Sequence, residues 1–205
     1  MDRFRSVQTI LSGIDVFIGG PIQHALRGDA LINKVQDPII SAIDAVTDAG
    51  GNVFSAHVAE AFGKQTAYFT PDEVSVRDFR WMNKCDVFVP VLPIQANGAL
   101  VRTDGTHVEL GWASALRRPI VLVTAHPFTE DASHLLKGLP RVGQVTVLGI
   151  DEFLKDPLHL ATIIARVVGT SMSASLPRVA KASTMERPNS TSPLKQRGKV
   201  NDNVT

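Results

Sequence analysis

The feature that most constrains the fold is a set of short, continuously apolar runs separated by segments with helical patterns. Apolar residues in these runs do not alternate with polar ones, which is typical of parallel strands covered on both faces. Strands that alternate with helices predict a doubly wound α/β fold, a five-stranded parallel sheet in flavodoxin-like order with helices on both faces. The five strands are expected at 15–19, 52–57, 86–92, 119–124 and 144–148.

The helices between the strands carry start and stop signals. Proline stands at the first position of three of them, since its missing N–H is not needed there. A capping box, in which a threonine and a glutamate three residues later satisfy the first backbone groups, is expected twice, at Thr70/Glu73 and Thr106/Glu109. The expected helices are 38–49, 71–84, 106–117 and 157–169.

The end of the chain differs from the rest in composition. Residues 170–205 contain 6 Lys and Arg, 2 Asp and Glu, 10 Ser and Thr, and no aromatic residue. Such a segment cannot bury enough apolar surface to offset the entropy lost on ordering it. We therefore expect a folded domain over 1–170 and a disordered basic tail over 171–205.

Composition also excludes several classes of protein. A net charge of +1 and 44% hydrophobic residues argue against a nucleic-acid partner and against a wholly disordered chain. Cys85 is the single cysteine, so neither a disulfide nor a cysteine-based zinc site can form, and no other residues have metal-ligand spacing. No apolar run reaches the roughly 20 residues of a membrane span. We therefore expect a cytoplasmic protein that has no membrane span and no metal site.

In a doubly wound sheet, ligands bind beyond the carboxyl ends of the strands. The loops expected to carry chemistry are therefore 19–29, 57–70, 93–109 and 125–133. Gly19 and Gly20 open the first of them, and glycines let a ligand approach the backbone closely. Because they fit neither the dinucleotide nor the P-loop fingerprint, no cofactor is expected, and a plain turn is an equally good interpretation.

Two carboxylates are candidates for catalysis. Glu109 falls in the first turn of its expected helix, where the helix terminus would keep it ionised, as a glycosyl nucleophile must be. On local sequence alone, the capping box explains Glu109 fully and favours a structural role for it. Asp78 falls within a helix, a position for which aspartate has poor propensity, and a solvated helix face is the alternative. His57 is expected at the end of the second strand. A lone histidine there is most simply interpreted as a surface or hydrogen-bonded residue.

Four segments of this sequence, in order and in register, resemble the nucleoside 2-deoxyribosyltransferase superfamily. They are VFIGGPI, FSAHVAEAFG, RDFRWMNKCDVFV and DGTHVELGWASALRRPIVLV, and they span about residues 14–124. The resemblance is closest to the branch that hydrolyses the N-glycosidic bond of nucleoside 5′-monophosphates. It implies the doubly wound fold, a small-molecule nucleotide or nucleoside as partner, and a homodimer or higher homo-oligomer.

Position by position, the resemblance implies that Glu109 attacks C1′ of the sugar and forms a glycosyl-enzyme ester. Asp78 would protonate or hydrogen-bond the departing base. Arg27 is the candidate for a positive charge that the loop GGPIQ lacks. The other implied substrate-binding residues are Phe17, Gly19, Gly20, Pro21, Ile22, His57, Trp81, Thr103 and Gly105.

Phe17 departs from the deoxyribose-specific relatives, which carry a tyrosine there. Its missing hydroxyl leaves room near C2′ for a ribose hydroxyl, and a phenylalanine here resembles the cytidylate N-glycosidases. We therefore expect an N-glycosidase that hydrolyses a pyrimidine nucleoside 5′-monophosphate, with cytosine implied by resemblance.

Two alternatives stay open: a 2-deoxyribosyltransferase that exchanges bases, and a nucleotide-sensing domain of the same fold. A sensing domain would be expected to lack Glu109 or Asp78. Both are present, which favours an enzyme.

Overall fold

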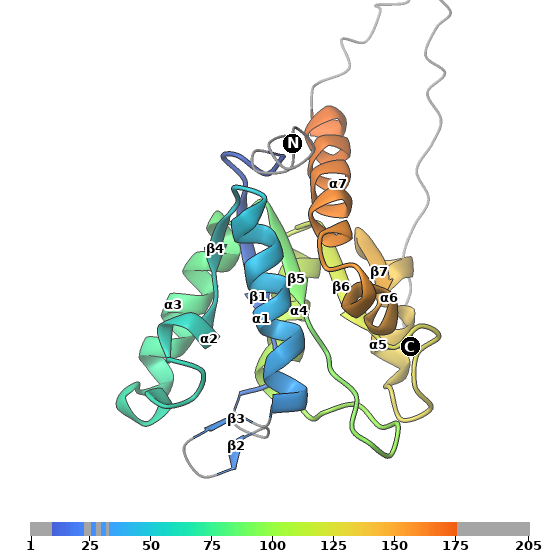
Figure 1. Cartoon of the computed structure of the whole chain (residues 1–205). Coiled ribbons are helices and arrows are strands. Elements are labelled where there is room, and N and C mark those ends of the chain that lie inside the picture. The colour runs from blue at the N-terminus through green and yellow to red at the C-terminus, as the bar shows by residue number, and fades with distance from the viewer. Residues whose placement is uncertain (1–9, 23–25, 28–29, 32, 176–205) are drawn as a thin grey trace, which may run out of the picture. The chain divides into compact units, whose positions relative to one another are not determined.

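In the computed structural model, residues 10–22, 26–27, 30–31 and 33–175 are described, and the predicted tail lies outside them from residue 176 on. A five-stranded sheet forms the centre, and every neighbouring pair of its strands is parallel (Figure 1). The spatial order β4-β1-β5-β6-β7 is the flavodoxin-like order 2-1-3-4-5 in sequence terms, which confirms the predicted fold class. The strands are β1 Asp15–Gly19, β4 Asn52–Phe54, β5 Val87–Pro90, β6 Ile120–Thr124 and β7 Val145–Gly149.

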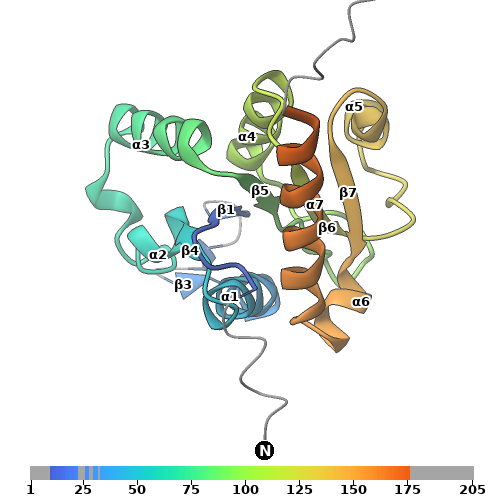
Figure 2. The ribbon, with the colours of Figure 1, turned by 90° about the horizontal axis from the view of Figure 1, so that it is seen from above.

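Helices cover both faces of the sheet (Figure 2). On one face lie α1 Asn33–Asp48, α6 Ile150–Lys155 and α7 His159–Ser175. On the other lie α3 Pro71–Lys84, α4 Asp104–Ala115 and α5 His134–Gly138. The shorter elements are β2 Leu26–Arg27, β3 Ala30–Leu31, α2 Ala56–Ala59, η2 Thr66–Tyr68 and η3 Leu139–Arg141.

Alternate residues of each strand supply two separate cores. In β1, Val16 and Ile18 are fully buried with the helices α1, α6 and α7. Phe17, between them, is fully buried on the other side with Phe88 of β5 and Met82 of α3. Burial on both faces is the reason for the continuous apolar runs in the sequence.

Four predicted boundaries are wrong. Helix α1 begins at Asn33, so Pro38 lies inside it, where a proline so close to the start removes one hydrogen bond of the ladder. Strand β4 ends at Phe54, and α2 follows directly. Helix α4 begins at Asp104 rather than at residue 106. Helix α7 does not end at Gly169 but continues to Ser175. Glycine is a poor helix former, but it can still lie inside a helix.

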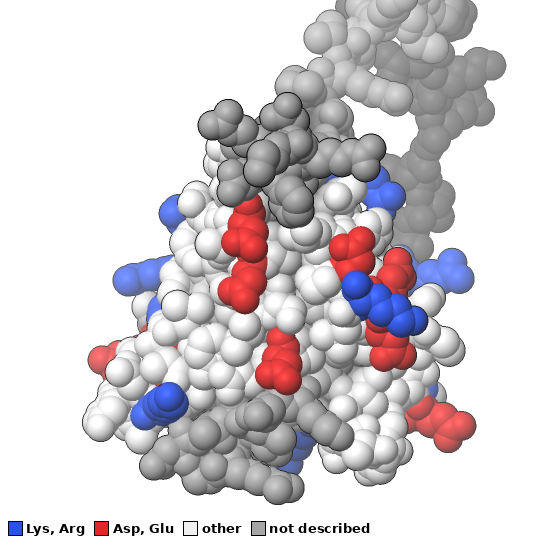
Figure 3. Space-filling model, viewed as in Figure 1, with Lys and Arg blue, Asp and Glu red and all other residues white. Residues whose placement is uncertain are grey.

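Charges of both signs are distributed over the face shown in Figure 3. The exposed acidic residues of α1 are Asp37, Asp44 and Asp48, on the side of the helix opposite to its buried stripe. Among the described residues, no helix combines the length and apolar character that crossing a bilayer takes.

Candidate active site

A pocket of about 160 Å³ opens at the carboxyl end of the sheet, beside the ends of β1 and β5. Three of the four loops predicted to carry chemistry line it, and the loop 125–133 does not. Six predicted site residues line it: Gly20, Ile22, Asp78, Thr103, Gly105 and Glu109. Seven other residues complete the wall: Ala56, Glu60, Thr66, Val74, Arg102, Asp104 and Thr106.

Glu109 projects into this pocket from α4 with its carboxyl group almost fully buried, and the residue is 8% exposed. Its Oε2 atom has no hydrogen-bond partner among the described residues. The backbone of Gly19 passes so close that a Cβ atom there would lie 2.6 Å from this oxygen. Glu109 is therefore held against the end of β1 with one free oxygen.

The predicted capping role of Glu109 is wrong. Thr103 is the N-cap of α4, and its hydroxyl accepts a hydrogen bond from the Thr106 backbone N–H at 3.4 Å. The same hydroxyl donates to the Thr106 hydroxyl at 2.7 Å. Since the helix starts two residues earlier than expected, Glu109 lies in its second turn, beyond the unsatisfied N–H groups of the first.

The expected ionisation of Glu109 is also wrong for the free protein. Its carboxyl has a pKa of about 8, raised mainly by burial and further by the negative charge of Asp78, with part of the rise offset by Arg77. The field of a helix terminus falls off within the first turn, so it does not reach this residue. Glu109 is protonated in the free protein at neutral pH.

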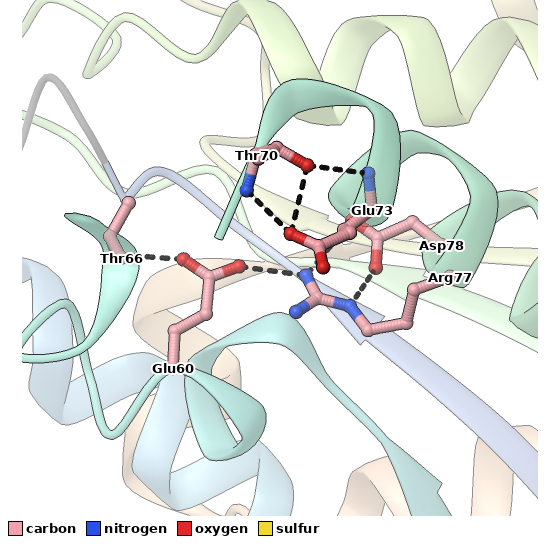
Figure 4. A network of polar contacts seen from close by, with 6 residues as sticks. All are labelled: Glu60, Thr66, Thr70, Glu73, Arg77 and Asp78. Carbon is pink, nitrogen blue, oxygen red and sulfur yellow. Dashed lines mark hydrogen bonds and ion pairs between the residues drawn. The ribbon is translucent and has the colours of Figure 1, made fainter. Parts of the chain in front are cut away.

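Asp78 is buried at 5% exposure, so the solvated helix face is excluded. It belongs to a polar network between α2 and α3 (Figure 4). Arg77 donates from Nε to Asp78 Oδ1 at 2.8 Å and from Nη2 to Glu60 Oε1 at 2.7 Å, and the Thr66 hydroxyl donates to Glu60 Oε2 at 2.7 Å. Burial raises the pKa of Asp78, and its bonds and ion pair with Arg77 offset part of the rise.

The predicted capping box of α3 is confirmed at the edge of this network. Thr70 accepts from the Glu73 backbone, and the Glu73 carboxylate accepts from the Thr70 backbone N–H. Figure 4 shows Glu73 above Arg77. The hydrogen bonds from Thr70 lower the pKa of Glu73.

Several predicted substrate contacts are not among the residues that line the pocket. Phe17 is wholly within the core, and Trp81 packs edge-on against it with ring centroids 5.8 Å apart. Pro21 is buried beside the pocket, and of Arg27 only the backbone, in the β2–β3 hairpin, is described. Neither of these two aromatic rings therefore lines the pocket.

His57 is a buried member of α2 rather than the end of a strand. Neither ring nitrogen has a hydrogen-bond partner among the described residues. Burial lowers the pKa of His57 to about 4, against smaller raising effects of the Gly20 backbone and the Glu60 charge. His57 is therefore neutral, and it packs behind the pocket wall, where a Cβ atom on Gly20 would lie 3.2 Å from its Nε2.

Sequence reasoning missed Glu60, Thr66 and Arg102. Glu60 was visible only as one charge in an otherwise apolar segment, AHVAEAF, which is a signal for a buried partner. Arg102 lies at the pocket and pairs with Asp104 at 2.8 and 3.0 Å. Within the part of the chain that the structure describes, no three metal-ligating side chains gather to hold an ion.

No protein-family model matches the sequence, and no curated protein matches it at a significant level. Among solved structures, the solution structure of BlsM has a TM-score of 0.62 and 29% identity, over 81% of this chain and 99% of that one. A CMP N-glycosidase from Clostridium botulinum, BcmB, has a TM-score of 0.49 and 23% identity, over 73% of this chain and 98% of that one. A flavodoxin-like domain from Synechococcus has a TM-score of 0.43 and 11% identity, over 78% and 99%.

BlsM matches this chain over nearly all of its own length. The pocket described above is built by segments that carry the four predicted motifs, which meet at one end of the sheet. The resemblance of this chain to the nucleoside 2-deoxyribosyltransferase superfamily, predicted from those motifs, is confirmed by this likeness.

Proposed function

We propose that the protein is an N-glycosidase that hydrolyses the bond between base and sugar in a pyrimidine nucleoside 5′-monophosphate. The observation that carries the proposal is the meeting of two buried carboxyl groups, Glu109 and Asp78, in one pocket. Retaining glycosyl transfer needs this pair, one group as nucleophile and the other as proton donor. The superfamily resemblance assigns the same two residues.

The buried pair holds one proton in the active state. Two carboxylates that share a pocket do not both ionise readily, because each charge raises the pKa of the other group. In the reactive arrangement Glu109 is the anion and Asp78 the acid. The unpartnered oxygen of Glu109 is the natural nucleophile, because no hydrogen bond has to be broken before it attacks.

The reaction then proceeds in two balanced steps. The Glu109 carboxylate forms a bond to C1′ as the bond from C1′ to the base nitrogen breaks, and the base takes the proton of Asp78. Water next attacks C1′ of the ester, releases Glu109, and returns one proton to the pair while the sugar phosphate leaves.

The residues at the mouth of the pocket favour a substrate that carries a 5′-phosphate. Arg102 brings an exposed guanidinium to this rim, and guanidinium binds phosphate through paired hydrogen bonds. Thr103 and Gly105 lie beside it at the start of α4, where the helix dipole favours an anion. The small volume of the pocket favours a base of one ring over a base of two.

The test is incubation of the full chain with CMP, UMP, AMP, GMP, their deoxy forms and cytidine, followed by chromatography of the released bases. Base release from a pyrimidine monophosphate, with cytidine a poorer substrate, is the expected result. Absence of base release from every nucleotide would overturn the proposal. A second base added to the reaction separates hydrolysis from transfer, since only transfer makes a new nucleoside.

A further inference from the structure

The Arg77 guanidinium makes hydrogen bonds to two different carboxylates. Its guanidinium forms a fork on Asp78, with Nε 2.8 Å from Oδ1 and Nη2 3.4 Å from Oδ2. The same Nη2 lies 2.7 Å from Oε1 of Glu60, which is 2% exposed. One cation thus bridges two buried carboxylates, one directly after α2 and one on α3.

Two aromatic rings hold the guanidinium between the helices. Its central carbon lies 4.9 Å from the ring centroid of Trp81 and 5.3 Å from that of Phe69. An arginine stacked on aromatic faces loses most of its rotamer freedom, so its hydrogen-bonding fork keeps a fixed direction. Trp81, predicted to be a wall for the base, instead packs on Arg77.

The charges that face Asp78 come from three segments of the chain. Arg77 lies on the same helix, Glu60 approaches from the turn that follows α2, and Glu109 approaches from α4. His57, also on α2, is neutral, because burial lowers its pKa to about 4. The described network around Asp78 therefore contains one fixed cation and two other carboxyl groups.

We infer that Arg77, anchored by Glu60, is a positioning residue that fixes the direction and the charge of Asp78 in the pocket. This inference rests on the proposed function, because it assigns Asp78 the role of proton donor there. Arg77 stabilises the carboxylate that Asp78 becomes once its proton has passed to the base. Glu60 holds the guanidinium in place and takes up part of its charge.

The two partners act on Asp78 with opposite sign. The Arg77 charge lowers the pKa of Asp78 and the Glu60 charge raises it. Loss of the cation should therefore make Asp78 a weaker acid, and loss of the Glu60 charge should make it a stronger one. A residue whose charge did not reach Asp78 would shift its pKa in neither direction.

The experiment titrates Asp78 by carboxyl ¹³C NMR in the wild type and in the variants Arg77→Gln, Glu60→Gln and the double variant. The free full-length protein is used, so this measurement does not depend on turnover. We expect the titration of Asp78 to move up by about 1–3 pH units in Arg77→Gln, the range for loss of an adjacent opposite charge. It should move down in Glu60→Gln, and the double variant, which leaves a neutral pair of amides, should fall between them.

The pH dependence of kcat/KM for CMP is measured on the same proteins. A second proton on the carboxyl pair inactivates it, so the acid limb should move with Asp78, upward for Arg77→Gln and downward for Glu60→Gln. Glu73→Gln removes a charge from the exposed edge of the network and keeps the capping box, so it should move neither measurement.

The possible outcomes separate the inference from the proposed function. Shifts of Asp78 in the same direction, or no shift in either single variant, overturn the inference even where CMP is hydrolysed. Opposite NMR shifts in a protein that releases no base support the network and overturn the proposed function. Loss of folding in one single variant leaves the double variant and the other single variant to decide.

Discussion

Replacement of Glu109 by glutamine should stabilise the folded protein at neutral and alkaline pH. Below pH 4.5 the carboxyl group is protonated in both the folded and the unfolded chain, so it does not change stability with pH. Between 4.5 and about 8 the unfolded chain releases the proton and the folded protein keeps it, so the wild type loses stability as pH rises. Glutamine does not titrate, and the variant avoids this loss.

The size of the effect follows from the width of that interval. Each pH unit over which the two states differ by one proton is worth about 1.4 kcal/mol. The variant should therefore match the wild type at pH 4.5, exceed its free energy of unfolding by about 3 kcal/mol at pH 7, and reach a plateau near 5 kcal/mol above pH 8.

Urea unfolding followed by circular dichroism at pH 4.5, 7 and 9 measures this difference. The control is Glu73→Gln, whose carboxylate is exposed and has a lowered pKa, so this variant should gain nothing at alkaline pH. An equal gain for Glu109→Gln at all three pH values would refute a buried, protonated Glu109. A loss of about 1 kcal/mol in Glu109→Ala, beside no gain in Glu109→Gln, would restore the capping role that the sequence suggested.

Three other changes test the site and its surroundings. Gly19→Ala would place a methyl group 2.6 Å from Oε2 of Glu109, so kcat for CMP should fall by about tenfold or more. The rate is measured on protein shown to be folded, and a wild-type kcat would contradict this contact. Phe17→Tyr should move the ratio of kcat/KM for CMP and dCMP toward dCMP by about 1–3 kcal/mol, and an unchanged ratio would make Phe17 only a core residue. Sedimentation velocity at micromolar concentration should find a homodimer or a larger assembly, because Phe79 on α3 leaves 43% of its surface exposed. A fully active monomer would contradict this prediction.

The parallel sheet with helices on both faces was predictable because its evidence is local and repeated. Continuous apolar runs such as 120–124 need cover on both faces, and only a parallel sheet with helices on each side supplies it. The capping box of Thr70 and Glu73 marked the start of α3 to the residue. Short elements such as α6 and the β2–β3 hairpin were missed, because they depend on contacts with distant parts of the chain.

The site was predictable in its carboxylates and not in their surroundings. Glu109 and Asp78 were found because the motifs around them are specific, and both line the pocket. A threonine three residues before a glutamate suggested a cap at Thr106, and a second threonine at 103 took that role instead. The bridge from Arg77 to Glu60 joins a residue of α3 to one seventeen positions earlier, in the turn after α2, and no local pattern predicts it.

Release of cytosine from CMP by the wild type and by Glu109→Gln, compared at matched protein concentration, tests the central claim most directly. Both proteins are first shown to be folded by circular dichroism, so that a difference in rate reports on the carboxyl group. We predict that the wild type releases cytosine and ribose 5-phosphate and that the variant is slower by several orders of magnitude, as follows from loss of a covalent nucleophile. Equal rates in the two proteins, or no cytosine from the wild type, would contradict the account.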